Sequence, residues 1–304
     1  MMPFFFIASL VFVLLVPVDA WCWGPITHLD YSSYVLQHIA TLSPVVKGLL
    51  KAYPYDFLYG SLAADITVGK AYVEYIYNCH NWRMGFLLLN EAKTKRQQAC
   101  AYGYLTHLAA DTVSHNFYVP YKLIRSFRTR TLKHTYWELR YDISRPKIVW
   151  SHFRELTKHD FKGNDELFQK MLKRTLFSFK TNKRIFNSIL MLHRLKQWEN
   201  GASRLARISK WTLDEADIRM YRKLSIDFIM DFLANPKKAK CVSLDPTGAE
   251  KINYAAIVRK RMKKALRRHL ISLKDSETMI LTVKKKLKEG LYRPVDLPQM
   301  IDYM

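Results

Sequence analysis

Apolar side chains recur along the chain with the spacing of helices. One face of a helix that the pattern opens near His28 carries Leu29, Val35, Leu36 and Ile39. Pro44 favours the start of the next helix. Alternation of apolar and polar positions, which is typical of half-buried strands, is scarce. The pattern therefore predicts an all-α fold.

The longest predicted helix spans residues 96–117. This stretch contains no proline, and Pro120 is expected to stop the helix shortly after it. A further helix is predicted around TRTLKHTYWELRYDI and is ended by Pro146. Residues 164–187 and 213–233 show the same helical pattern.

The N-terminus carries an apolar run from Phe4 to Val16, which is shorter than the ~20 residues that a membrane span needs. We therefore expect residues 1–22 to be a signal peptide and the protein to be exported, either periplasmic or secreted. Small residues permit cleavage after Ala20 or after Cys22, and either cut leaves a tryptophan first. A membrane-anchored form with an uncleaved segment stays open.

Composition and charge narrow the class of partner. The chain has 304 residues, of which 49% are apolar, enough for one large domain or two small ones. Its formal net charge of +23 predicts attraction to anionic partners, such as a phospholipid surface or nucleic acid. Much of the excess lies in the basic amphipathic stretches KINYAAIVRKRMKKALRRHL and LTVKKKLKEG, although such a charged face can also be merely solvated.

Four cysteines are too few for a disulfide scaffold. One optional bridge is conceivable, and Cys79 and Cys100 are the candidate pair because both flank segments that carry the possible metal ligands discussed next.

Three residues of the long helix form a possible metal-binding stripe. His107, Asp111 and His115 are spaced at i, i+4 and i+8, so each step rotates by only about 40° and the three side chains share one face. The alternative is a pair of buried histidines that hydrogen-bond to one aspartate. His134 and Glu138 repeat the i, i+4 spacing on the next predicted helix.

An imidazole beside a carboxylate is a donor pair that zinc accepts, and zinc sites use three or four protein ligands. Further donors are therefore required from other segments if the stripe binds metal. His28, Asp65 and His80 supply them.

The motifs WGPITH, GSLAADI, HNW, GYLTHLAADTVSH and HTYWE occur in the order and approximate spacing of a known superfamily. Over residues 21–142 the chain resembles the zinc-dependent phospholipase C and single-strand nuclease superfamily, most closely the bacterial zinc-dependent phospholipase C-like proteins. The resemblance implies a phospholipase C/nuclease-like helical fold with a trinuclear zinc site, to which basic C-terminal helices are added.

The resemblance also implies which residues bind the three zinc ions (Zn²⁺). The expected positions are all filled, by Trp23, His28, Asp65, His80, His107, Asp111, His115, His134 and Glu138. Trp23 would bind through its backbone amino and carbonyl groups. It is preferred because the interval from Trp23 to His28 is that of the fungal nucleases, and Trp21 is the alternative if cleavage follows Ala20.

In this scheme, Asp111 bridges the zinc ion held by Trp23 and His28 to a second one held by Asp65, His80 and His107. The third zinc takes the remaining ligands. Asp65 is also expected to act as the catalytic base that accepts the proton of the attacking water.

The implied activity is hydrolysis of a phosphodiester, and the leading expectation is phospholipase C-type cleavage of phospholipids at an anionic membrane surface. The alternatives are a single-strand nuclease or nucleotidase with the same metals, and a non-catalytic membrane- or nucleic-acid-binding protein with structural zinc. Residues 23–240 would form the catalytic domain, and residues 241–304 a basic helical extension packed on it. The loop NPKKAKCVSLDPTG marks this boundary.

Overall fold

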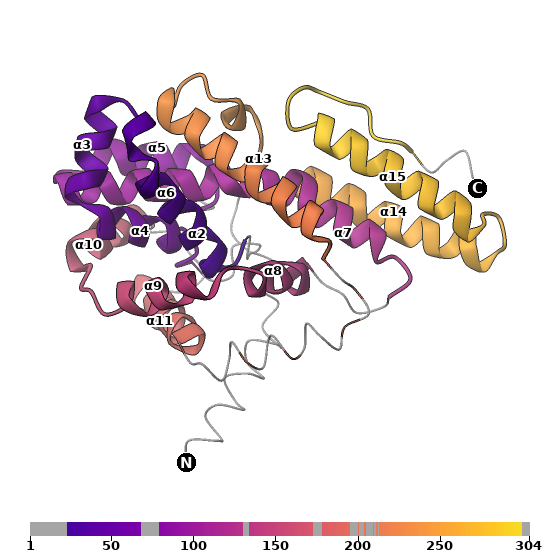
Figure 1. The fold of residues 1–304 in the computed structure, drawn as a ribbon, viewed down its shortest axis with the longest axis horizontal. Coiled ribbons are helices and arrows are strands. Elements are labelled where there is room, and N and C mark those ends of the chain that lie inside the picture. The colour runs from indigo at the N-terminus through magenta and orange to yellow at the C-terminus, as the bar shows by residue number, and fades with distance from the viewer. Residues whose placement is uncertain are drawn as a thin grey trace, which may run out of the picture.

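The computed structural model describes residues 23–67, 79–129, 134–172, 178–194 and 213–299, together with four single positions between 200 and 211. Every regular element in these ranges is helical, as Figure 1 shows, which confirms the predicted all-α class. The expected signal peptide lies outside the described residues, so its cleavage point stays a prediction. None of the described helices combines the length and apolarity that crossing a membrane requires.

The helices are given in chain order. They are α2 (Pro25–Gln37), α3 (Pro44–Ala52), α4 (Pro54–Ala63), α5 (Trp82–Glu91), α6 (Lys95–Val113), α7 (Val119–Arg125), α8 (His134–Ile143), α9 (Lys147–Leu156), α10 (Lys162–Met171), α11 (Phe179–Arg194), α13 (Glu215–Ala234), α14 (Ala249–Arg267) and α15 (Leu273–Glu289). The short turns are η1 (Ile39–Thr41) and η5 (Lys240–Ser243), which are 3₁₀, and η4 (Ser114–Tyr118), which is a π-helix.

Local sequence explains where several helices begin. Pro44 opens α3 as predicted, and Pro25 and Pro54 open α2 and α4 in the same way, because proline lacks the N–H that a first helical residue leaves unbonded. Helix α6 starts with a capping box, in which Thr94 and Gln97 bond reciprocally to each other's backbone N–H.

Helix α6 is the centre of the fold. It packs against α4, α5, α13, α10 and α2, and its residues are almost continuously buried from Ala99 onward. The closest approach is to α4, where a methyl group on Gly103 would lie 2.0 Å from the Phe57 carbonyl oxygen. Glycine is therefore required at this crossing. The central position of α6 explains how one helix can contribute side chains to several parts of a site.

The prediction that Pro120 stops the long helix was wrong. The chain passes from α6 through the π-helix η4 directly into α7, and Pro120 lies in the first turn of α7. In an uninterrupted α-helix a proline ring clashes with the carbonyl four residues earlier. In a π-turn the backbone bonds instead reach the carbonyl five residues earlier, so the turn is wider. Helical structure therefore continues past the proline.

The C-terminal helices α14 and α15 run side by side as a hairpin along α7, and they extend away from α3 and α5 (Figure 1). Both also contact the π-helix η4. Buried residues such as Val258, Met262, Ile280 and Val283 hold the hairpin to the body. Helices α14 and α15, which lie within the range expected to form a basic extension, thus pack against the helices that follow α6.

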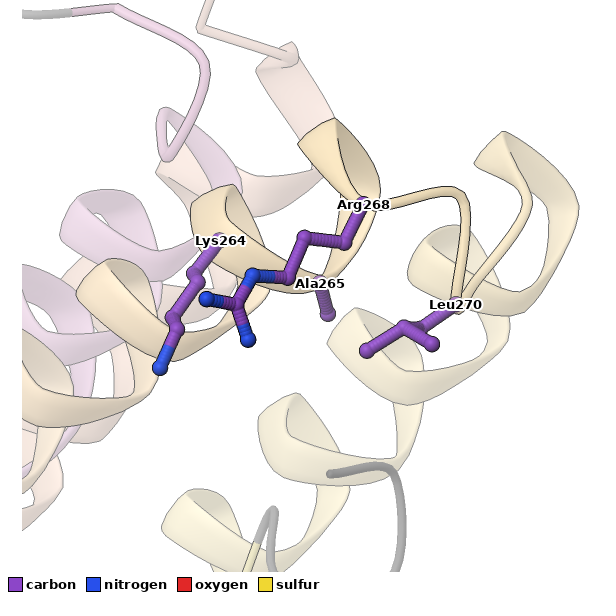
Figure 2. A pocket seen from close by; sticks show the side chains of 4 residues that line it. All are labelled: Lys264, Ala265, Arg268 and Leu270. Carbon is purple, nitrogen blue, oxygen red and sulfur yellow. The ribbon is translucent and has the colours of Figure 1, made fainter.

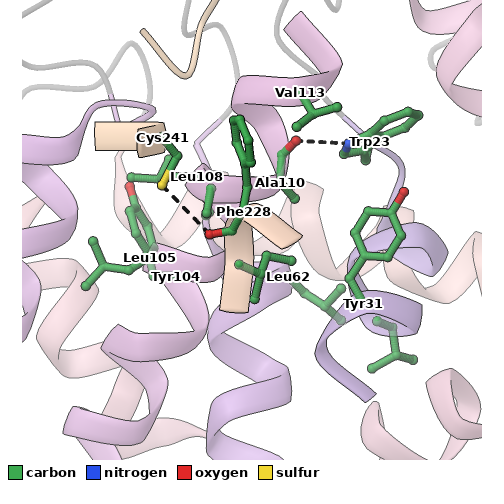
Figure 3. Close-up of a cluster of buried hydrophobic side chains, with 14 of the residues drawn as sticks. Trp23, Tyr31, Leu62, Tyr104, Leu105, Leu108, Ala110, Val113, Phe228 and Cys241 are labelled. Atoms are coloured by element: carbon green, nitrogen blue, oxygen red, sulfur yellow. Dashed lines mark hydrogen bonds between the residues drawn. The ribbon is translucent and has the colours of Figure 1, made fainter. Parts of the chain in front are cut away.

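The suggested disulfide is not formed. Cys79 and Cys100 are both buried and are not bonded to each other, and Cys241 is also buried. Cys241 instead lies in the apolar core beside Phe228, where Figure 3 also shows Trp23 and Leu108.

Candidate metal centre

Helix α6 presents His107 and Asp111 one turn apart, as their spacing predicted. The Nε2 atom of His107 lies 2.9 Å from Oδ2 of Asp111, and both side chains are buried. Because α6 runs through the core, the pair meets side chains that are supplied by several other segments.

His28 approaches this pair from α2. Its ring stacks on that of His107 with 3.7 Å between the ring centres, and its Nε2 lies 3.3 Å from Oδ1 of Asp111. His28 therefore faces Oδ1 of Asp111, whereas His107 faces Oδ2.

Asp65 and His80 approach from the other side. Asp65 follows α4, and His80 precedes α5, whose first turn is capped by the side chain of Asn81. Nε2 of His80 lies 3.3 Å from Oδ1 of Asp65, 3.3 Å from Oδ2 of Asp111 and 2.9 Å from Nε2 of His107. With His28, five donor groups from four segments thus converge within the protein interior.

These atoms form two overlapping groups that could each hold a metal ion: one of His28, His107 and Asp111, the other of Asp65, His80 and His107. Donors around a tetrahedral zinc with bonds of about 2.0–2.1 Å are about 3.3 Å apart. The separations of Nε2 of His28 from Asp111, and of Nε2 of His80 from both carboxylates, match this value.

A backbone contact fixes which nitrogen of His107 faces the cluster. Nδ1 of His107 lies 2.8 Å from the Ser61 carbonyl oxygen, and because a carbonyl can only accept, Nδ1 carries the proton. Burial, partly opposed by the nearby Asp111 charge, lowers the pKa of His107 to about 4. At neutral pH, Nε2 therefore presents a lone pair to the carboxylate, as a metal ligand does.

The chemistry of the donor set fits a cation. Nε2 of His28 and both carboxylate oxygens of Asp111 are buried and form no hydrogen bond with the described residues. Buried polar atoms without partners are costly, so such a concentration of lone-pair donors requires positive charge. Imidazole and carboxylate together suit zinc.

His115 lies in the π-helix η4 and points to a different partner from His107 and Asp111. Its Nε2 is 3.9 Å from Oε1 of Glu138 on α8. Its Nδ1 donates to the Pro246 carbonyl oxygen at 2.6 Å, which again directs Nε2 toward the carboxylate. His134 begins α8, but its side chain lies outside the described residues, so the third predicted ligand set is seen only in part.

Trp23 is the first described residue, and its indole is wholly buried. The ring packs against Tyr118 and Tyr141, and its Nε1 donates to the Ala110 carbonyl oxygen at 3.1 Å, as Figure 3 shows. This contact anchors Trp23 to the residue that precedes Asp111 on α6. Metal binding through the Trp23 backbone stays a prediction.

The sequence analysis missed Asp142, which holds the segment after Trp23 in place. Its carboxylate accepts from Thr27 N at 2.8 Å, Thr27 Oγ1 at 2.6 Å and Ile26 N at 3.3 Å. These groups belong to the first turn of α2, directly before His28, where backbone N–H groups have no partner four residues earlier within the helix. Burial raises the pKa of Asp142 to about 6, against these hydrogen bonds. The only signal in the sequence was its position four residues after Glu138, on the same helical face.

A second omission is the loop that precedes α14. Trp82 Nε1, close to His80, donates to the Leu244 carbonyl oxygen at 2.9 Å, and Asn116 Nδ2 donates to that of Asp245 at 2.8 Å. Gly248, with φ of 55°, lies so close to His115 that a methyl group on it would be 2.4 Å from the His115 carbonyl oxygen. The loop thus contacts and supports both the HNW segment and the π-helix.

One comparison with known proteins covers the segment that holds most of these residues. A family model described as zinc dependent phospholipase C matches residues 27–184, just over half of the chain and a range that includes every expected ligand except Trp23. No curated protein and no solved structure matches the chain. The protein described here belongs to the zinc-dependent phospholipase C family.

Proposed function

We propose that this protein is a phosphodiester hydrolase with three zinc ions that cleaves phospholipids between glycerol and phosphate. The observation that carries the proposal is the position of Asp111, whose two carboxylate oxygens face two different sets of buried imidazole nitrogens. Family membership supports the reaction type. The substrate and the number of metals belong to the proposal.

The ligands divide as follows in this proposal. His28 and Asp111, with the backbone of Trp23, hold the first ion; Asp65, His80, His107 and Asp111 hold the second; His115, His134 and Glu138 hold the third. His107 belongs to both geometric groups, but its single lone pair serves one ion only. A carboxylate has two oxygens, so Asp111 is the better bridge.

When bound, the zinc ions supply positive charge for the phosphate oxygens and lower the pKa of water toward neutrality. The chain itself contributes orientation and proton transfer. The carbonyl of Ser61 holds the ring of His107, and that of Pro246 holds the ring of His115. Asp65 is our candidate for the general base, because it is a carboxylate at the edge of the donor cluster.

The protein is further proposed to be exported and processed. A backbone amino group can bind zinc only when it is free, so the signal peptide must be removed next to the tryptophan that serves as ligand. Measurement of the intact mass of the exported protein distinguishes Trp23 from Trp21 as the first residue. A mass that retains residues 1–20 would contradict the role given to the amino group.

The activity test compares two substrates and two histidine variants. The protein should release the phosphorylated head group from phosphatidylcholine, and we expect His107→Ala to abolish this release and to lower the zinc content. His152→Ala is the matched control, because His152 is exposed and remote from the donor cluster in sequence. We expect this control to behave as the wild type does.

Cleavage of single-stranded DNA without cleavage of phospholipid would replace the phospholipase proposal by a nuclease on the same metals. Tight zinc binding without hydrolysis of either substrate would indicate a structural metal site. If His107→Ala kept its full zinc content and activity, the ligand assignment itself would be wrong.

A further inference from the structure

The turn between α14 and α15 presents two leucines to solvent. Leu270 is 51% exposed and Leu273 is 55% exposed, while Ile271 between them is buried. One apolar side chain of this turn, the tip of the hairpin, is therefore buried and anchors the hairpin, whereas the two leucines beside it are exposed to solvent.

The turn is held in a defined conformation. Helix α14 ends with a Schellman motif, in which His269 N donates to Leu266 O, Leu270 N donates to Ala265 O, and His269 adopts a φ of 57°. A capping box formed by Ser272 and Asp275 starts α15 directly afterwards. The exposure of the two leucines is thus built into the ends of both helices.

Positive charge predominates on the α14 side of these leucines, whereas the exposed Asp275 and Glu277 begin α15. From residue 251 to residue 274 the chain has nine lysines and arginines and no aspartate or glutamate. Lys260, Lys264, Arg267 and Arg268 are exposed and form no ion pair with the described residues. On the exposed surface of α13, by contrast, Arg219 and Lys223 each pair with a carboxylate one turn away.

A hollow of about 240 Å³ lies where the charge and the apolar surface meet. Figure 2 shows Lys264 and Arg268 projecting from the last turns of α14, with Leu270 across the hollow from Arg268. Two cationic groups beside an aliphatic side chain offer a lipid both a partner for its phosphate and a contact for its chain.

The tip is separate from the metal centre. The base of α14 touches His115 through Gly248, and α14 has 19 residues. At 1.5 Å per residue, the tip lies roughly 28 Å along the helix from that contact. Substitutions at the tip can therefore be made without touching the proposed zinc ligands.

We propose that the tip of the α14–α15 hairpin docks the protein onto an anionic phospholipid bilayer, with Leu270 and Leu273 inserted among the head groups and the nearby cations held at the lipid phosphates. The proposal rests on the proposed function only in taking the bilayer as the source of substrate. Lysine and arginine side chains are attracted to an anionic lipid surface, and exposed leucines add apolar burial. Nucleic acid would use the cations but would gain little from aliphatic leucines.

The test measures binding of the full-length mature protein to vesicles by cosedimentation. Vesicles of phosphatidylcholine alone are compared with vesicles that contain equal parts of phosphatidylcholine and phosphatidylglycerol. The wild type should bind the anionic vesicles more tightly, and added salt should weaken this binding. We expect the pair Lys264→Gln and Arg268→Gln to weaken it by about tenfold or more, and the pair Leu270→Ser and Leu273→Ser by about threefold or more.

Matched controls come from α3, at the opposite end of the molecule in Figure 1. Lys47→Gln with Lys51→Gln removes the same charge from exposed positions, and Val45→Ser removes an apolar side chain that is 80% exposed. These controls should change vesicle binding by less than about twofold, since only general net charge is altered. Hydrolysis of a soluble phosphodiester should be unchanged in all of these variants.

The proposal is overturned if the tip variants and the α3 controls lose binding equally, or if the leucine pair has no effect while the basic pair weakens binding to single-stranded DNA. Vesicle binding that depends on the tip, in a protein that hydrolyses no lipid, would leave the docking intact and reject the proposed function. Hydrolysis of soluble substrate without any vesicle binding would reject the docking and leave the proposed function intact.

Discussion

Asp111 concentrates the chemistry of the site in one side chain, because each of its two oxygens faces a different group of nitrogens. Asp111→Asn keeps the shape and one acceptor oxygen but removes the negative charge and replaces the second oxygen by a donor. We expect it to lose more zinc than His107→Ala does, since a bridging ligand serves two ions. Metal analysis of the purified variants measures this directly.

Asp217→Asn is a suitable control for Asp111→Asn, because it also alters a buried carboxylate but at the contact of α13 with Lys122. It should change stability and leave the zinc content intact. Equal loss of zinc in Asp111→Asn and His107→Ala would contradict the bridging role.

At the residue scale, the sequence predicted those contacts that depend on helical spacing. His107 and Asp111 lie on one turn of α6, so four residues of separation were enough to pair them. The carbonyls of Ser61 and Pro246 orient His107 and His115. These carbonyls belong to the backbone, so no residue type in the sequence indicates their role. Asp142 contacts residues more than a hundred positions away, and no local pattern encodes such a distance.

At the scale of elements, the π-helix η4 limits what spacing can predict. The sequence analysis placed His115 on the same stripe as His107 and Asp111 by assuming uninterrupted α-helix. The π-turn begins at Ser114, so regular α-helical spacing does not extend to His115, which lies 3.9 Å from Glu138, its partner in the implied third ligand set. Pro120, which the sequence analysis took for a helix end, lies in the first turn of α7. Single π-turns inside helices are frequent at functional sites, and sequence periodicity does not distinguish them.

The loop before α14 allows a test of how the third ligand set is supported. Gly248→Ala places a methyl group against the His115 backbone and forces a side chain into the left-handed region. We expect a loss of roughly 1–2 kcal/mol in stability and a lower zinc content, measured by denaturant unfolding and metal analysis. Gly163→Ala is the control, since a methyl group there meets no atom within 4 Å. Unaltered zinc in Gly248→Ala would show that the loop does not position His115.

The contact of α7 with α13 and α15 carries a pH-dependent element. Lys122 on α7 is buried, and burial lowers its pKa to about 8 although Asp217 lies 3.1 Å away. In the unfolded chain the pKa is near 10.5, so between these values the unfolded chain binds more protons. Stability should therefore rise with pH from 8 toward about 10, by up to roughly 3 kcal/mol.

Lys122→Met should remove this rise and leave stability at neutral pH unchanged or higher, because Lys284 still pairs with Asp217 at 2.7 Å. Thermal unfolding at several pH values measures the slope. Lys223→Met, at an exposed position, should retain the slope of the wild type. Strong destabilisation of Lys122→Met at neutral pH would mean that the cation is required for the contact.

At the scale of the whole molecule, the site draws on nearly the full described length of the chain. The donors come from α2, the end of α4, the start of α5, α6, η4 and α8, whereas the supporting carbonyl of Pro246 lies beyond residue 184, where the family match ends. Sequence motifs revealed the donors because each is short and local. They could not reveal that the basic C-terminal region supports the π-helix, since that contact exists only after folding.

This wide distribution predicts that metal removal affects the entire fold. A folded chain without zinc holds the lone pairs of His28 Nε2 and of both oxygens of Asp111 together in a dry interior, which costs free energy. Zinc present at a thousandfold excess over its dissociation constant stabilises a protein by about 4 kcal/mol per site. Chelation should therefore lower the melting temperature by on the order of 10 °C.

The fall in melting temperature must also come from the donor cluster, and not from metal that is lost elsewhere in the protein. In His107→Ala the chelator should produce a smaller shift in melting temperature, because one ion is already bound weakly, whereas in His152→Ala the shift should equal that of the wild type. Zinc added back after chelation should restore the original value. A melting temperature that chelation leaves unchanged would mean that the converging donors of α2, α4 and α6 are stable without a cation, and that the buried lone pairs are satisfied in some other way.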